Sequence, residues 1–185
     1  SVLDREQKIH NITIEKDQDS NLGINFKDAL FDTIKQCNNN CPFCFIDQQP
    51  FGKRKSLYIK DDDYRLSFLY GSYLTLTNLK KEDWNRISTQ KLSPLFVSVH
   101  ATDPKTREFL LKNKKARKII EQIQWFEKNE IQMHAQIVVC PKINDDQILE
   151  KSIYDLARFH KKNKQTVLSV AIVPVGLTKF RPEDD

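Results

Sequence analysis

Strand-like and helix-like segments alternate along most of this chain, and this alternation restricts its fold more than any other feature. Five segments have the length and composition of strands: residues 29–34, 72–78, 95–101, 131–140 and 167–175. Helical patterns are expected at residues 61–70, where Gly71 would cap the C-terminus, at 115–129 and at about 146–160. Strands that alternate with helices of this length predict repeated βα units and a parallel α/β sheet.

The predicted strands carry one apolar and one polar face. The polar positions are Tyr73, Thr75, Thr77, Ser98, His100, Gln132, His134 and Gln136. A solid barrel core would require branched apolar residues inside, so these positions predict a partial (β/α) barrel whose wet interior holds a ligand. In the alternative interpretation, the same residues face solvent on an open sheet.

A separate N-terminal segment is expected before this domain. Residues 11–16 and 22–26 alternate apolar and polar side chains around the polar stretch 17–21, which is typical of a hairpin. We therefore assign residues 1–28 to a hairpin or linker and residues 29–185 to the partial barrel.

Composition indicates a soluble globular protein, with 39% apolar and 30% charged residues. The longest apolar run, 167–177, is too short for a membrane span and contains Pro174. The net charge of +5 is mild, and the basic stretches 53–55, 112–118 and 161–164 are better explained as solvated faces than as a nucleic-acid site. We expect a cytoplasmic protein without a membrane partner, and nucleic-acid binding is not favoured.

Three of the four cysteines, Cys37, Cys41 and Cys44, follow the first predicted strand with the spacing C-x3-C-x2-C. In a reducing compartment such a cluster predicts a metal site rather than disulfides. A structural zinc site would need a fourth ligand, for which Cys140, His100 and His134 are candidates. An iron–sulfur cubane with one open iron needs no fourth ligand, and both interpretations stay open at this point.

The cysteine motif resembles that of the radical S-adenosylmethionine (SAM) superfamily, in which an aromatic residue usually precedes the third cysteine, as Phe43 does here. The stretches CPFCFIDQ, KSLYIKDDDYRLSFLYG, LTLTNL, LSPLFVSVHATDP and PVGLTKFR resemble one uncharacterised radical SAM family of Fe–S oxidoreductases. Its members carry a PDZ-like domain before the barrel and a domain of unknown function after it. The resemblance implies a six-stranded partial barrel, so the five strands counted here indicate a truncated central fragment.

The resemblance also implies the cofactors. Cys37, Cys41 and Cys44 would hold a [4Fe–4S] cluster whose open iron chelates SAM. A donor such as ferredoxin or flavodoxin would reduce the cluster, and reductive cleavage of SAM would start radical chemistry on an unknown substrate. The residues expected to hold SAM are Phe43, Thr77, Asn78, His100, His134 and Gln136.

Some of these residues have alternative roles. Thr77 and Asn78 stand where many superfamily members have a Gly-Gly-Glu-like turn, and this chain lacks that turn. For His100 and His134, a hydrogen-bonded structural role is the alternative to SAM binding. The carboxylates of Asp61, Asp62 and Asp63 are better explained by helix capping and an ion pair to Arg65 than by metal binding.

The alternative function is a non-enzymatic module. Such a module would bind zinc or an iron–sulfur cluster for structure or electron transfer, and its lysines would dock an acidic partner. The two functions differ over whether Cys140 is a ligand.

Overall fold

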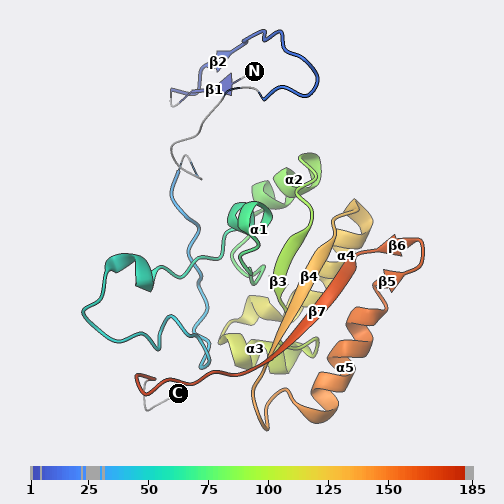
Figure 1. The fold of residues 1–185 in the computed structure, drawn as a ribbon. Helices are drawn as coiled ribbons and strands as arrows, with labels where there is room; N and C mark the ends of the chain where they lie inside the picture. Colours follow the sequence, from blue (N-terminus) through green and yellow to red (C-terminus); the bar gives the residue numbers. More distant parts are fainter. Residues whose placement is uncertain (1, 5, 22, 24–29, 31, 182–185) are drawn as a thin grey trace. The chain divides into compact units, whose positions relative to one another are not determined.

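A computed structural model describes residues 2–4, 6–21, 23, 30 and 32–181, and the chain divides into two compact units, Ser1–Asp32 and Thr33–Asp185 (Figure 1). The predicted boundary after residue 28 falls at the end of an undescribed stretch, 24–29. In the first unit, β1 (Val2–Leu3) pairs antiparallel with β2 (Ile9–His10).

The hairpin predicted at residues 11–26 is not formed in its described part. Residues 11–16 are not in a strand, although a turn follows, where Ser20 N donates to Asp17 O at 3.1 Å. Residues 22 and 24–26 of its second arm lie outside the described residues. Ile12 and Ile14 are exposed, so the alternating pattern finds no apolar layer to pack against.

The second unit contains a parallel sheet in the order β3-β4-β7 (Figure 1). Its strands are β3 (Leu95–Ser98), β4 (Met133–Val139) and β7 (Val167–Pro174), which confirms three of the five predicted strands. A short antiparallel hairpin, β5 (His160–Lys161) and β6 (Lys164–Gln165), precedes β7.

The other two predicted strands are not formed as expected. The segment 72–78 contributes one parallel bridge, between Leu74 and Val97, and its extended backbone ends at Leu76, whose φ of 63° lies in the left-handed region. Thr75 N donates to a carboxylate oxygen of Asp62 at 2.5 Å. Residues 30 and 32–34 are not in a strand, and residues 29 and 31 lie outside the described part. The described strands therefore form no closed barrel, and the expected lumen is replaced by an open sheet face.

Five α-helices are present in the described chain. They are α1 (Tyr64–Tyr70), α2 (Lys81–Thr89), α3 (Pro104–Leu111), α4 (Ile119–Asn129) and α5 (Asp146–Ala157), with 3-10 turns η1 (Lys55–Tyr58) and η2 (Lys114–Lys118). Those predicted at 61–70, 115–129 and 146–160 are confirmed. None of the described helices combines the length and hydropathy that a membrane crossing requires.

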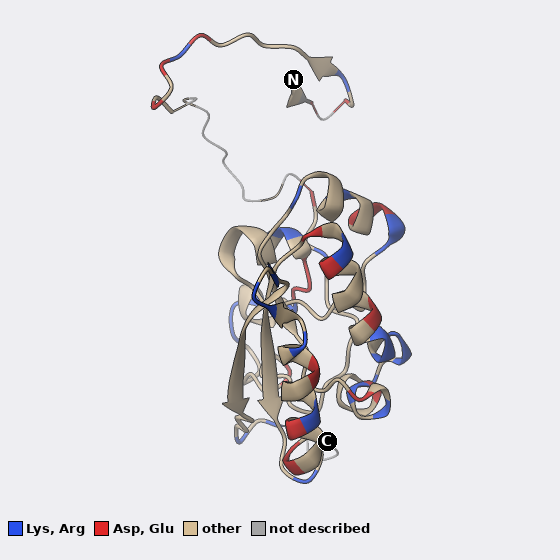
Figure 2. Ribbon diagram, turned by 90° about the vertical axis from the view of Figure 1, so that its right-hand side faces the viewer, with Lys and Arg blue, Asp and Glu red and all other residues tan. Residues whose placement is uncertain are grey.

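The main core lies between one face of the sheet and helices α2, α4 and α5 (Figure 2). On the strands it contains Leu95, Val97, Met133, Ala135 and Ile137, and on the helices Ile87, Ile119, Ile123, Phe126 and Leu156. The alternation along β4 places the odd-numbered residues in this core, and the polar even-numbered residues on the opposite face. The predicted distribution of apolar and polar faces is therefore confirmed for β4.

Helix α1 begins and ends as predicted. Asp63 is its N-cap and accepts a hydrogen bond from Arg65 N at 3.0 Å, while Arg65 Nη2 lies 2.7 Å from the other carboxylate oxygen. Gly71 ends the helix in the left-handed region, with φ of 75°, and its N–H donates to Ser67 O. The capping role proposed for Asp63 is thus confirmed.

We expect Gly71→Ala to lower the free energy of unfolding by about 1 kcal/mol, because an L side chain is strained at this φ. The added Cβ would meet the Phe96 ring at 3.4 Å, so strain rather than a clash dominates the effect. Urea denaturation measures the difference. The control is Gly176→Ala, where a Cβ meets nothing within 4 Å. Equal stabilities of the two variants would contradict the prediction.

Candidate functional site

The cysteine loop, residues 37–60, is closed at its base by backbone hydrogen bonds. Cys37 N donates to Lys60 O at 2.8 Å, and Asp62 N donates to Lys35 O at 2.9 Å. Gln36 and Asp61 form an antiparallel bridge between these bonds. The loop therefore starts at its first cysteine.

The loop lies at the C-terminal ends of the parallel strands. After β7, Thr178 N and Thr178 Oγ1 donate to the side chain and main chain of Gln48, each at 2.8 Å. After β3, the ring of His100 lies 4.8 Å from that of Phe43 in an edge-on contact. The cysteines thus sit at the edge of the sheet where βα folds carry their chemistry.

The three thiols are free and partly buried. Burial raises the pKa of the Cys37 thiol, and it raises that of Cys41 to about 12, with a further contribution from the charges of Cys37 and Cys44. No group of three or more His, Cys, Asp or Glu side chains in the described chain is arranged to hold a metal ion. The donor set fits a three-thiolate centre, but binding would have to bring the sulfurs together and displace their protons.

Cys140 lies in an apolar cluster against which Cys41 and Phe43 of the cysteine loop also pack. It is 6% exposed and packs in an apolar cluster with Ala101, Leu110, Leu111 and Ala116. Its backbone N–H donates to Asn144 Oδ1 at 2.7 Å, which ends β4 in a turn. This placement is that of a small buried side chain at a strand end.

Thr77 and Asn78 hold the base of the cysteine loop. Thr77 Oγ1 donates to Asn38 Oδ1 at 2.9 Å, and Asn78 Nδ2 donates to the carbonyls of Gln36 and Asp62 at 3.1 and 2.8 Å. Asn78 Oδ1 is buried and has no hydrogen-bond partner within the described part of the chain. This oxygen is an acceptor that a bound ligand or a water molecule could use.

His100 links the ends of two strands. It is 4% exposed, and its Nδ1 accepts a hydrogen bond from Val138 N at 3.2 Å. Burial, with a smaller contribution from the Arg107 charge, lowers its pKa to about 3, so the ring is neutral at physiological pH. The structural role left open by the sequence is present here, beside Phe43.

His134 and Gln136 lie on the open face of the sheet. His134 stacks on Phe96 with ring centroids 4.7 Å apart, and its Nδ1 lies 2.8 Å from Ser169 Oγ. At the rise of a strand, His134 is about 20 Å from Cys140 along β4. Of the residues predicted to bind SAM, Phe43 belongs to the cysteine loop, and Thr77, Asn78 and His100 lie beside that loop. His134 lies at the opposite end of β4.

Arg107 is a central residue of the site that the sequence analysis missed. It projects from α3, is fully buried and donates to four backbone carbonyls, those of Thr75 (2.9 Å), Ser98 (2.9 Å), Val99 (2.8 Å) and Ala116 (2.7 Å). Burial lowers its pKa to about 10, which still leaves it charged at pH 7. One sequence signal could have identified Arg107 as a buried residue. It stands three positions before Leu110 and four before Leu111, which places it on the apolar face of the helix.

Asp62 was grouped in sequence with the capping carboxylates, but its position is different. It is 1% exposed and accepts hydrogen bonds from Thr75 N and Thr75 Oγ1 at 2.5 and 2.6 Å. Burial raises its pKa to about 6. Asp62 therefore joins the loop base to the segment that follows α1.

The raised pKa makes stability depend on pH. A folded-state pKa of about 6, above the unfolded value of about 3.9, means that the contribution of Asp62 to stability is greatest below pH 4 and is lost as pH rises through 6. Relative to Asp62→Asn, the wild type should lose up to about 3 kcal/mol of unfolding free energy between pH 4 and 7. Urea denaturation at several pH values measures this difference.

Asp103→Asn is the control for the sign of this effect. The backbone hydrogen bond from Thr106 lowers the pKa of Asp103, so the wild type should gain stability over this variant as pH rises to about 5 and should lose none of that gain up to pH 7. If the stability of the wild type relative to Asp62→Asn stays constant or rises between pH 4 and 7, the pKa of Asp62 is not raised and the prediction is wrong.

Comparison with known proteins agrees with this site. No curated protein matches the chain. A family model described as the radical SAM-like domain matches residues 16–167, which contain the whole cysteine loop and strands β3 and β4. Since this match spans most of the sequence, the chain belongs to the radical SAM-like domain family.

Proposed function

We propose that this chain is the core of a radical SAM enzyme, an Fe–S oxidoreductase in which Cys37, Cys41 and Cys44 hold a [4Fe–4S] cluster. The observation that carries the proposal is the placement of three free thiols on one loop, at the C-terminal ends of parallel strands, in a chain of this family. When bound, such a cluster supplies the electron that cleaves SAM reductively and starts radical chemistry on a substrate still to be identified. Its need for reducing conditions agrees with the predicted cytoplasmic location.

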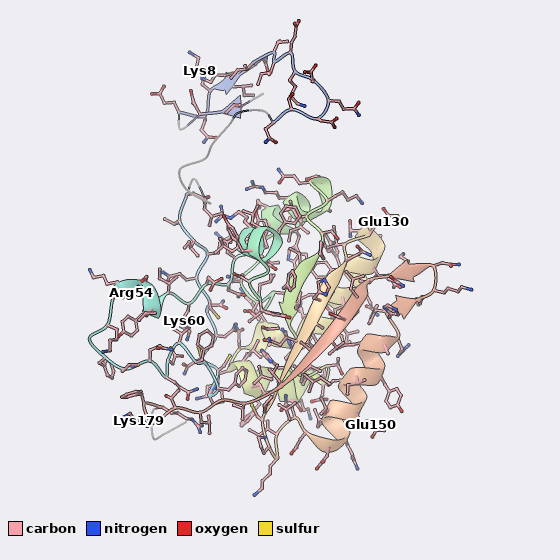
Figure 3. The ribbon with its side chains drawn as sticks, in the orientation of Figure 1. Lys8, Arg54, Lys60, Glu130, Glu150 and Lys179 are labelled. Atoms are coloured by element: carbon pink, nitrogen blue, oxygen red, sulfur yellow. The ribbon has the colours of Figure 1, made fainter. Side chains whose placement is uncertain are left out.

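The chain's own groups suit a negatively charged centre. Lys60 lies at the base of the cysteine loop, and its Nζ is 2.7 Å from Asp47 Oδ2 (Figure 3). The hydrogen bond to Asp47 raises the pKa of Lys60, and the charges of Cys44 and Cys37 add to this rise. The buried guanidinium of Arg107 opposes the rise in the pKa of Cys41. Both cations would favour thiolates over thiols when a metal binds.

For SAM, we propose the residues predicted from the sequence, with support that differs among them. The rings of Phe43 and His100 contact each other beside the cysteines. The unpartnered Asn78 Oδ1 could accept a hydrogen bond from a donor such as an ammonium group. The Thr77 hydroxyl is engaged within the protein. Gln136 and His134 lie farther along the sheet, where a substrate would extend.

We also propose that the sheet belongs to a partial (β/α) barrel of the radical SAM type. The parallel bridge between Leu74 and Val97 supports a further strand beside β3. Helices α2, α4 and α5 cover one face only, which leaves the polar face open toward a ligand.

The rival function, a closed structural zinc site, requires a fourth protein ligand. His100 Nδ1 is used by Val138 N, which argues against this histidine as the fourth ligand. Cys140 is buried in an apolar cluster against which Cys41 also packs, so Cys140 is the fourth ligand that an experiment must test.

After anaerobic reconstitution with iron and sulfide, the protein should bind about four irons and, once reduced, cleave SAM to 5′-deoxyadenosine. Changing Cys37, Cys41 or Cys44 singly to Ala should abolish cluster binding and cleavage, because each sulfur holds one iron. Iron and sulfide analysis measures the cluster, and chromatography measures the cleavage product.

Cys140→Ser is the matched control, and it should keep the cluster at a packing cost of about 1 kcal/mol. Loss of iron from Cys140→Ser as complete as from Cys41→Ala would establish a four-ligand centre and refute the proposal. A stable cluster without SAM cleavage would instead favour the electron-transfer module.

We further propose that the reducing partner is an acidic ferredoxin or flavodoxin. Lys53, Arg54 and Lys55 are exposed on the cysteine loop, close in sequence to Phe51, which is 99% exposed. Figure 3 labels Arg54 on this part of the loop. An exposed aromatic residue beside three cations suits an acidic protein surface. Docking there would bring the partner to the same loop as the cysteines.

Reversal of these three charges to Glu should slow reduction by flavodoxin about tenfold or more at low salt, because electrostatic steering is lost. Reduction by dithionite should be unchanged. The control reverses Lys161, Lys162 and Lys164, which lie on or between β5 and β6, before the start of β7. Stopped-flow absorbance measures both rates, and equal slowing in the two triple variants would refute docking at the loop.

A further inference from the structure

Asn39, the middle residue of the run Asn38-Asn39-Asn40 between the first two cysteines, is buried with 6% exposure. Its Nδ2 donates to Cys37 Sγ at 3.3 Å and to Thr75 Oγ1 at 2.9 Å. Its Oδ1 accepts from Asn113 Nδ2 at 2.7 Å and lies 3.1 Å from Thr77 Oγ1, whose single hydrogen can go to Asn38 Oδ1 instead. A primary amide has two N–H donors, and both of those of Asn39 are used.

The orientation of this amide is determined by its neighbours. Thr75 Oγ1 gives its single hydrogen to Asp62 Oδ2 at 2.6 Å, so toward Asn39 it can only accept. On the other side, the Asn113 amide donates to Asn39, which requires an oxygen there. Exchange of the oxygen and nitrogen of Asn39 would break both contacts, and the N–H group must therefore face the sulfur.

The other two asparagines of the run do not share this role. Asn38 is exposed, and its Oδ1 accepts from Thr77 and Asn113. Asn40 is also exposed, and its described hydrogen bond is from its backbone N to Leu111 O. In the described chain, the donor to Cys37 is the buried middle residue.

We infer that Asn39 is a positioning residue that holds an N–H donor against the Cys37 sulfur and thereby sets the reduction potential of the centre that this sulfur ligates. A hydrogen bond to a ligating sulfur withdraws negative charge, which stabilises the reduced, more negative form of a cluster. The network through Thr75 to Asp62 and Asn113 keeps the donor in place before a metal arrives. The part of this inference that concerns the potential rests on the proposed function.

The first measurement is the midpoint potential of the reconstituted protein, by redox titration followed by electron paramagnetic resonance. Asn39→Ala should shift the potential to a more negative value, because the donor is lost. Asn113→Ala removes one anchor of the amide from a partly exposed position and should give a smaller shift in the same direction. Asn40→Ala, on the same loop, should give no shift.

The second measurement needs no cluster. In the metal-free protein, hydrogen exchange of the Cys37 amide, which is bonded to Lys60 O, should become about fivefold faster in Asn39→Ala, the factor expected for losing one ordinary hydrogen bond that resists loop opening. Asn40→Ala should leave this rate unchanged.

The two measurements separate the inference from the proposed function. If the wild type binds no cluster, the proposed function fails, and the exchange rate still decides whether Asn39 holds Cys37. If the cluster forms but the potentials of Asn39→Ala and Asn40→Ala are equal, the inference is overturned while the function stands. If Asn39→Ala does not fold, the midpoint potentials of Asn113→Ala and Asn40→Ala are compared instead. Equal potentials in these two variants would overturn the inference.

Discussion

The buried guanidinium of Arg107 joins the parts of the second unit from which the site is built. It binds carbonyls of the segment after Leu74, of the end of β3 and of η2, and all of its described partners are backbone oxygens. Burial of a charge without partners would cost far more than a hydrogen bond returns, so this arrangement is stable only when all three segments are in place. Burial of the Arg107 guanidinium thus requires these three segments to be folded, and the guanidinium in turn holds the three segments together.

The cysteine loop depends on the same interaction through Thr75. Its carbonyl is bound by Arg107 and its N–H by Asp62, so both of its backbone groups are satisfied without a neighbouring strand. The Thr75 hydroxyl then lies between Asp62 and Asn39, and Asn39 contacts the Cys37 sulfur. A continuous chain of hydrogen bonds therefore connects a buried helix residue to the candidate metal ligand.

Local patterns allowed correct predictions where one segment alone carries the information. The spacing of Ile119, Ile123 and Phe126 placed α4, and the alternation along Met133–Val139 placed β4 with its buried and polar faces. The hairpin at residues 11–26 failed in its described part because an alternating pattern does not specify the surface that covers it. Arg107 and Asp62 were missed because charged residues are rarely buried, and their partners are distant in sequence.

The sequence by itself determined the identity and spacing of the three thiols, the helix caps and the amphipathic faces, because these depend on residues only a few positions apart. The tertiary structure decided which of the three consecutive asparagines faces the sulfur and which of the three consecutive aspartates binds Thr75. Those choices depend on contacts such as Asn39 to Asn113 and Asp62 to Thr75, which form only after the helices have packed on the sheet. A hydrogen bond across such a separation leaves no periodic signal in the sequence, since either residue alone resembles its exposed neighbours.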